Sequence, residues 1–186
     1  MCEKMNLPSG VAIKTAIDVA TIDFGALIKE LRDKTFNGYL AITVQGIGGI
    51  EEGIVVFDNG KIVASFYEYF KHNKQVMGDL AFQRIMNASA AHRGVVDIFQ
   101  LNNDQVQLIL AFNEQAICLP TDSDVKKLKV DDFSPFFEEQ VKETAATGNK
   151  GELMKKYKLG DVETKEKAEV TDEEAEDLMK DLFKGK

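Results

Sequence analysis

The side chains that most often catalyse reactions or bind metals are few and scattered in this chain of 186 residues. The cysteines are Cys2 and Cys118, and the histidines are His72 and His92. Structural zinc sites and disulfide frameworks need several such residues at short, regular spacing, and that spacing is not found here. Cys118 lies in an apolar run, so we interpret it as a small buried hydrophobe. We therefore expect no bound metal and no cofactor.

Both histidines have structural interpretations that we prefer over catalysis. His72 lies between a predicted strand and a predicted helix, where a solvated loop side chain is expected. His92 lies at the predicted end of a helix, where a positive side chain interacts well with the helix dipole. Ser65 and Ser89 have no histidine near them in sequence, and no serine lies in a nucleophile elbow. Catalysis would require His72 or His92 in a cleft beside a carboxylate or a hydroxyl.

Acidic side chains occur in four groups, which we interpret as solvated or helix-capping carboxylates. A glycoside hydrolase would need two carboxylates at a fixed separation across a cleft, which a sequence does not reveal. The groups are Glu51-Glu52, Asp131-Asp132, Glu138-Glu139 and Asp172-Glu173-Glu174.

A glycine-rich segment at residues 45–50 raises the question of phosphate binding. Phosphate-binding loops place their glycines between a strand and a helix, so that backbone N–H groups meet the phosphate. Here Gly46, Gly48 and Gly49 lie between two predicted strands, and no Gly-Lys-Ser/Thr follows. We predict a hairpin loop and keep these glycines as candidates for ligand or interface contact.

An aromatic run at residues 66–70 supplies the other candidates for a pocket or an interface, Tyr67 and Tyr69. Strand alternation places these two tyrosines on one face of a sheet and Phe66, Glu68 and Phe70 on the other. Packing of the tyrosines on an edge strand of the sheet is the alternative that we favour.

The elements around these candidates begin with a predicted three-stranded antiparallel meander over residues 38–70. Asn59-Gly60 separates two β-rich runs, and a type I′ hairpin turn favours this dipeptide because both of its central residues need positive φ. Residues 54–57 are apolar on both sides of the pleat, so we expect both faces of this strand to be covered. Helices of the same chain can cover one face, and more of this chain or a second subunit the other.

Apolar periodicity predicts further elements on either side of the meander. We expect a strand at residues 11–19 and a helix that Thr21 or Asp23 caps and that stops at Asn37-Gly38. A second helix carries Val76 and Met77 and ends near residues 92–94, and a short strand follows at residues 95–99. A third helix, for which Asn102, Asn103 and Asp104 offer caps, carries Val106, Ile109, Leu110 and Ile117.

The composition changes after residue 119. We predict an α+β domain at residues 10–119, a charged connecting segment with a short helix at 120–150, and an acidic amphipathic helical tail at 151–186. The tail carries an apolar stripe at helical spacing that needs a docking surface. Its residues are Leu178, Met179, Leu182 and Phe183.

Composition restricts the class of partner. Hydrophobic residues make up 44% and charged residues 29%, which is typical of a globular protein. The net charge of −8 argues against nucleic acid and against an anionic membrane surface. No apolar run approaches the ~20 residues of a membrane span, and the amino terminus lacks the pattern of a signal peptide. We expect a cytoplasmic location, and the negative charge indicates either solubility or a partner with a basic patch.

Three motifs carry a resemblance to a known family: NGYLAI at residues 37–42, EGIVVFDNGKIVA at 52–64 and GDLA at 78–81. Together with the tail motif GELMKKY at 151–157, they resemble the archaeal domain of unknown function 2226. More distantly, the chain is similar to the amino-terminal domains of PatA-like bacterial response regulators. The archaeal resemblance implies the fold and an archaeal, cytoplasmic origin but no catalytic residues, and the bacterial one implies a regulatory or adaptor role.

These observations favour a non-enzymatic interaction or regulatory module that self-associates through its sheet. A sensor of a nucleotide or metabolite, with Tyr67, Tyr69 and the glycine loop around a pocket, is the first alternative. An enzyme is the second alternative and the third hypothesis overall.

Overall fold

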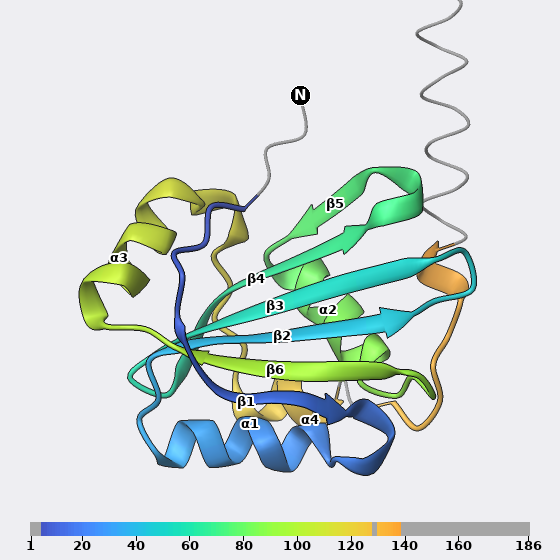
Figure 1. Cartoon of the computed structure of the whole chain (residues 1–186), viewed down its shortest axis with the longest axis horizontal. Helices are drawn as coiled ribbons and strands as arrows, with labels where there is room; N and C mark the ends of the chain where they lie inside the picture. Colours follow the sequence, from blue (N-terminus) through green and yellow to red (C-terminus); the bar gives the residue numbers. More distant parts are fainter. Residues whose placement is uncertain (1–4, 128–129, 139–186) are drawn as a thin grey trace, which may run out of the picture. The chain divides into compact units, whose positions relative to one another are not determined.

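The computed structural model describes residues 5–127 and 130–138 (Figure 1). The strands are β1 Val11–Asp18, β2 Gly38–Gln45, β3 Ile50–Asp58, β4 Lys61–Tyr69, β5 Lys74–Met77 and β6 Gly94–Gln100. The α-helices are α1 Phe24–Asp33, α2 Asp79–Ala88, α3 Asn103–Phe112 and α4 Asp122–Lys127, and the 3-10 helices are η1 Val19–Thr21, η2 Phe70–His72 and η3 Glu114–Ala116.

The strands form one six-stranded antiparallel sheet in the order β1-β6-β2-β3-β4-β5. The prediction of an α+β fold is therefore confirmed, and β2, β3 and β4 are the predicted meander. The sheet is wider than the meander because β5 joins beside β4 while β6 and β1 join beside β2. Strand β6 thus lies beside β2 although 48 residues separate the end of one from the start of the other.

The predicted hairpin turn at Asn59-Gly60 is confirmed. Asn59 and Gly60 both have positive φ, at 47° and 78°. A Cβ on Gly60 would stand 2.5 Å from the backbone oxygen of Arg32, and the Gly60 amide donates to the Phe36 carbonyl at 2.9 Å. The turn is therefore packed against the end of α1 as well as set by its own backbone geometry.

Helix α1 begins as predicted and ends earlier than predicted. The Asp23 side chain accepts a hydrogen bond from the Ala26 amide, which caps the first turn. The helix ends at Asp33 rather than at Asn37-Gly38, because Thr35 adopts a left-handed backbone with φ of 48°.

Two further helix predictions are wrong at their ends. Val76 and Met77 belong to β5, and α2 begins only after Gly78, whose φ of 65° interrupts the pattern. Helix α2 then ends at Ala88, well before residues 92–94.

Helix α3 has the predicted Asn102 cap, with Gln105 completing a capping box, but it ends at Phe112. Ile117 therefore lies outside this helix and pairs with Ala64 in an isolated β-bridge. Local apolar periodicity did not distinguish strand β5 and the Ile117 bridge from helix.

The sheet has two faces with different covers. On one face, α1, α2 and α4 supply buried side chains that include Ile28, Ile85 and Val125. On the opposite face, α3 supplies Val106 and Ile109, and Met5 and Leu7 pack beside them. Residues 54–57 of β3 are all buried, so the prediction of cover on both faces is confirmed for this strand.

The compact unit continues beyond residue 119. Val125 of α4 is buried in the core, and Phe133 packs against it. The Asn87 side chain exchanges two hydrogen bonds with the Ser134 backbone, at 2.8 and 2.9 Å. The predicted tail at residues 151–186 lies outside the described residues. None of the helices that the structure describes is long and apolar enough to span a membrane.

Candidate functional site

The predicted candidates Tyr67 and Tyr69 meet in a buried polar cluster on the face of the sheet that α1, α2 and α4 cover. The Tyr67 hydroxyl donates to the Glu51 carboxylate at 2.6 Å, and the rings of Tyr67 and Tyr69 pack edge to face at 5.1 Å. Arg84 of α2 interacts electrostatically with both tyrosines and with Glu51. We call Glu51, Tyr67, Tyr69 and Arg84 the buried cluster.

Burial governs the protonation of this cluster. Desolvation and the neighbouring Glu51 raise the pKa of Tyr67 far above its usual range, and desolvation raises that of Tyr69. Desolvation lowers the pKa of Arg84, which nevertheless stays charged near neutral pH. Both tyrosines are therefore neutral, and Tyr67 serves Glu51 as a hydrogen-bond donor. At 1% and 2% exposure neither ring forms part of the surface.

The glycine loop is the predicted hairpin loop between β2 and β3, closed by a hydrogen bond from the Gly46 amide to the Gly49 carbonyl at 2.9 Å. A Cβ on Gly46 would overlap the Glu51 carboxylate. A Cβ on Gly48 would overlap the carboxylate of Glu138. Two of the three candidate glycines thus make room for acidic side chains of the same chain.

Glu138 is held at this loop by two polar contacts. The Gly48 amide donates to its Oε2 atom at 2.8 Å, and the His72 Nε2 atom lies 3.2 Å from its Oε1 atom. The side chain of Glu138 is 3% exposed. Next to it, the Phe137 ring lies under the Arg84 guanidinium, 3.6 Å from ring centroid to carbon. Residues 133–138 therefore connect the glycine loop to the buried cluster.

Two predictions about polar side chains are wrong here. His72 is not a solvated loop residue, because its side chain is only 14% exposed and contacts Glu138. Glu51 and Glu138 are buried rather than solvated or helix-capping. Strand alternation could have placed Glu51 on the inner face with Val55 and Phe57. Glu138 and Arg84 had no sequence signal, because only the tertiary fold brings them to the loop.

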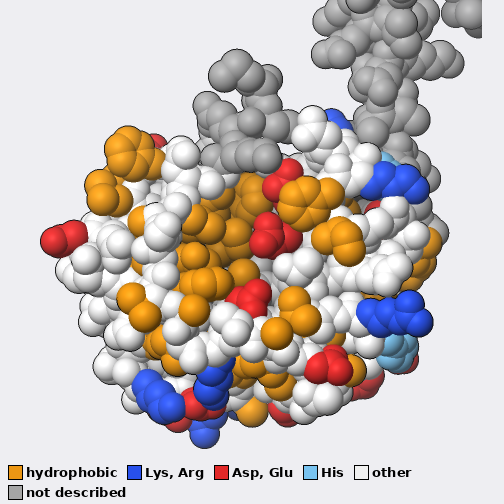
Figure 2. All heavy atoms as spheres, in the orientation of Figure 1, with side chains coloured by type: hydrophobic (Ala, Val, Ile, Leu, Met, Phe, Trp, Pro, Cys, Tyr) orange, Lys and Arg blue, Asp and Glu red, His pale blue; other side chains and the backbone are white. Residues whose placement is uncertain are grey.

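The opposite face of the sheet carries acidic side chains in its less covered part. Glu52 of β3 stands directly opposite Glu68 of β4, and Asp97 of β6 lies on the same face. Ile50 and Val95, 49% and 37% exposed, lie beside them on that face. Figure 2 shows acidic side chains surrounded by hydrophobic ones in the middle of this view. We call Glu52, Glu68 and Asp97 the acidic patch.

The acidic patch is electrostatically strained. Burial, together with the charges of Glu68 and Asp97, raises the pKa of Glu52. Like charges directly opposite each other in a sheet are destabilising. Asp97 accepts a hydrogen bond from the Ala16 amide at 2.7 Å, where β1 is irregular and Ala16 has φ of 54°.

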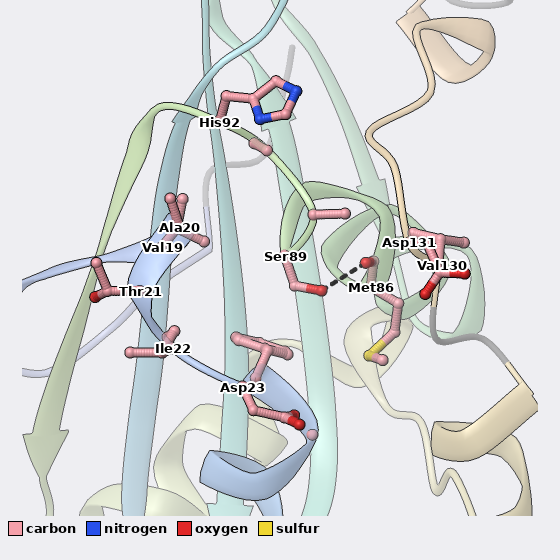
Figure 3. A pocket seen from close by; sticks show the side chains of 14 residues that line it. Val19, Ala20, Thr21, Ile22, Asp23, Met86, Ser89, His92, Val130 and Asp131 are labelled. Carbon is pink, nitrogen blue, oxygen red and sulfur yellow. Dashed lines mark hydrogen bonds between the residues drawn. The ribbon is translucent and has the colours of Figure 1, made fainter.

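A cavity of about 430 Å³ lies away from these residues, between η1, the start of α1 and the chain that follows α2 (Figure 3). His92, Ser89, Asp23 and Asp131 are among the residues that line it. The Ser89 hydroxyl donates to the Met86 carbonyl at 2.7 Å and does not point at His92. His92 follows α2 by several residues, so its predicted capping role is wrong. A second cavity of the same volume is lined by Phe82, Pro120 and Lys127.

Cys118 is buried as predicted, with 3% exposure. Its thiol donates to the Ser65 hydroxyl at 3.2 Å, and that hydroxyl donates to the Gly78 carbonyl at 2.7 Å. Burial raises the pKa of the thiol to about 11. Among the described residues no three His, Cys, Asp or Glu side chains are grouped as metal ligands.

Comparison with known proteins identifies the family. Residues 5–113 match the model of a family of uncharacterised proteins conserved in archaea, domain of unknown function 2226, and the chain belongs to this family. A protein of Archaeoglobus fulgidus, named only as uncharacterised, is 28% identical over 95 residues, which are 51% of this chain and 37% of that protein. The chain thus covers little more than a third of that relative. No solved structure matches at a significant level.

The family match covers the sheet and helices α1, α2 and α3. It confirms the archaeal resemblance seen in the motifs at residues 37–42, 52–64 and 78–81, while the tail motif at 151–157 lies outside the match. The bacterial resemblance, and the regulatory role that it implies, stays a prediction.

Proposed function

We propose that this chain is a protein-interaction module that binds, through its acidic patch, a partner segment with both apolar and basic side chains. One observation carries the proposal: three carboxylates, the half-buried Glu52 and Asp97 and the 7% exposed Glu68, lie within a sheet face that is apolar and only partly covered by α3. Apolar contact gives such a segment affinity, and opposite charge gives it register and rate of association.

The arrangement of the acidic patch supports a cationic partner. Glu52 and Glu68 face each other across adjacent strands, which costs the isolated domain stability. A lysine or arginine placed between them would turn the repulsion into attraction. Local arrangements that oppose stability occur most often at functional sites. The net charge of −8 attracts basic partners over longer range as well.

Charge also bears on self-association through this face. In a two-fold symmetric contact a surface patch meets its own copy. The acidic patch would then face a second acidic patch, and like charges brought together at an interface cost several kcal/mol, as a rough figure. We therefore favour a different protein as the partner over a second copy of this chain.

The test compares the chain with a variant that removes the charge of the patch. The double variant Glu52→Gln/Glu68→Gln is titrated against fluorescently labelled amphipathic peptides that carry lysine, with charge-reversed peptides alongside. The matched control is Asp33→Asn/Asp79→Asn, which removes the same charge from exposed sites on α1 and α2, on the other face. We expect salt-sensitive binding of the basic peptides that the patch variant loses and the control keeps.

Equal binding by the patch variant and the control would contradict the proposal. Binding of acidic and basic peptides alike would also contradict it. If the wild-type chain and the patch variant both sediment as dimers, the chain self-associates through a surface other than the acidic patch.

A small-ligand sensor is the second candidate, and the cavity beside His92 favours it (Figure 3). Its volume of about 430 Å³ falls in the range of small-molecule sites. The tyrosines and the glycine loop pack against side chains of this chain, so this cavity replaces them as the place for a ligand. A thermal-shift screen with nucleotides and metabolites tests it, since a ligand at 100 times its dissociation constant adds ~2.7 kcal/mol of stability.

The apolar stripe of the tail extends the interaction proposal. We predict that Leu178, Met179, Leu182 and Phe183 dock on a protein surface. Deletion of residues 150–186 should leave the melting temperature of the remaining domain unchanged while it weakens partner capture. A large loss of stability on deletion would instead assign the stripe to the core of this chain.

A further inference from the structure

A carboxylate of this chain fills a hollow that the rest of the domain forms. Glu138 accepts the Gly48 amide at 2.8 Å and contacts the His72 imidazole at 3.2 Å, with 3% of its side chain exposed. Burial of a carboxylate is costly unless donors compensate for lost water. This hollow supplies a backbone N–H, an imidazole and the nearby charge of Arg84, which are the groups that recognise anionic oxygens.

The groups that contact Phe137 and Glu138 belong to other parts of the chain. Gly48 lies in the β2–β3 loop, His72 in η2 and Arg84 in α2. The loop is closed by its own hydrogen bond from Gly46 to Gly49. Gly48 lacks the Cβ that would overlap a carboxylate at this place, and its backbone φ is not left-handed. Glycine at position 48 therefore provides space for the carboxylate rather than a special turn.

The segment that supplies Glu138 is attached in an unusual way. Phe136 is 55% exposed, whereas the carboxylate two residues later is buried. The usual pattern of attachment is the reverse, with the aromatic ring inside and the charge in water. The attachment therefore relies on Glu138, on the Phe137–Arg84 contact, on the Asn87–Ser134 pair and on Phe133, which packs only partly buried against the core. Segments with little buried apolar surface open locally at low free-energy cost.

We propose that the hollow formed by Gly48, His72 and Arg84 is a recognition site for an aromatic–carboxylate pair of a peptide, and that Phe137-Glu138 occupies it in cis as a competitor. The carboxylate binds the Gly48 amide and the His72 imidazole, and the preceding aromatic ring stacks on the Arg84 guanidinium. An acidic segment of another protein binds the same groups when residues 133–138 are displaced. This site lies on the face of the sheet that carries α2, opposite the face that carries the acidic patch, so the two sites are independent.

The experiment frees the hollow and supplies its occupant in trans. The full chain with Phe137→Ala/Glu138→Gln, labelled with ¹⁵N, is titrated with the blocked peptide FSPFFE, the sequence of residues 133–138. The Gly48 amide resonance is the readout. A tethered segment acts at an effective concentration of the order of mM, so peptide is added to ~10 mM. A peptide ending in Gln serves as the matched control.

We expect a saturable shift of the Gly48 amide with the Glu peptide, binding at least ~10-fold weaker with the Gln peptide, and ~10-fold weaker binding by the wild-type chain. Adding Gly48→Ala to the variant should abolish binding. A folded variant whose Gly48 resonance responds to neither peptide, or equally to both, overturns the proposal.

A second measurement covers the case in which the variant does not fold. Hydrogen exchange of the wild-type chain compares the Gly48 amide with the Leu40 amide in the middle of β2. We expect the Gly48 amide to exchange through local opening, at least ~100-fold faster than the Leu40 amide. Addition of the Glu peptide should not raise the exchange rate of Gly48. Exchange of Gly48 only at the rate of global unfolding would overturn the proposal.

Discussion

Neutralising one carboxylate of the acidic patch is expected to stabilise the domain. Glu52→Gln keeps the shape of the side chain and removes the charge that faces Glu68 across β3 and β4. Directly opposite side chains have Cβ atoms about 5 Å apart, so the charged groups lie roughly 6 Å apart. With the effective dielectric constant of about 20 that applies near a protein surface, Coulomb's law gives an upper figure of about 2.8 kcal/mol of repulsion.

The expected gain follows from that figure after a reduction for salt and side-chain motion. Measured cross-strand pairs contribute about 0.2 to 1 kcal/mol, so we expect Glu52→Gln to raise the free energy of unfolding by about 0.5 to 1 kcal/mol at pH 7. For a chain of this size, that raises the melting temperature by roughly 2 to 4 °C at most. Urea unfolding followed by circular dichroism measures the change.

The gain should depend on pH in a defined direction. The pKa of Glu52 is raised in the folded protein above its ordinary value of 4.5. The folded state therefore binds the proton more tightly than the unfolded state, and the wild-type chain loses stability as pH rises through and above this value. The advantage of Glu52→Gln should be complete at pH 7 and absent well below pH 4.5.

A double-mutant cycle gives the sharpest refutation. Glu68→Gln alone should give a similar gain, and the double variant should add little to either, because one substitution already removes the repulsion. Additive gains, a gain that persists at low pH, or a loss of stability at pH 7 would refute the reasoning. The gain should also shrink in 1 M salt, where screening acts over ~3 Å.

Two substitutions and one alkylation test the buried contacts and the hairpin turn of the domain. Tyr67→Phe removes the hydrogen bond to the buried Glu51 carboxylate and should cost about 1 to 3 kcal/mol in urea unfolding. Gly60→Ala forces a side chain against the Arg32 backbone at positive φ and should cost roughly 1 to 3 kcal/mol or more by the same measurement. Cys118, with its pKa raised to about 11, should be alkylated at pH 8 only after unfolding, as mass spectrometry of its peptide would show.

Matched controls separate these effects from general damage. Tyr69→Phe removes a hydroxyl that makes no hydrogen bond within residues 5–127 and 130–138, so it should cost less than Tyr67→Phe. Asn59→Gly keeps the positive φ of the turn and should be nearly neutral. Rapid alkylation of Cys118 in the folded chain would contradict its burial.

Local sequence patterns were sufficient where one element decides its own geometry. Asn59-Gly60 specified the hairpin because positive φ at both positions is a property of the backbone itself. Capping residues placed two helix starts to within a few positions, because a capping side chain reaches only its own first turn, and the structure selects Asp23 and Asn102 among the candidates. Apolar residues 54–57 specified a strand covered on both faces.

The same patterns failed where distant segments compete for the chain. Val76 and Met77 have helical spacing to the apolar residues of α2, yet they complete the sheet beside β4, because Gly78 breaks the run and β4 offers free hydrogen-bonding groups. Ile117 was assigned to α3 for the same reason and instead bridges to Ala64.

The sequence by itself determined the class of fold, the hairpin, the helix caps and the family, because each depends on local backbone preference or on a motif read in order. Only the tertiary structure decided what the polar residues do. It turned Glu51 inward to Tyr67, brought Glu138 to Gly48 and His72, and set Glu52 against Glu68. These pairs join residues 16 to 90 positions apart, and their energies depend on burial and distance, which sequence spacing does not encode.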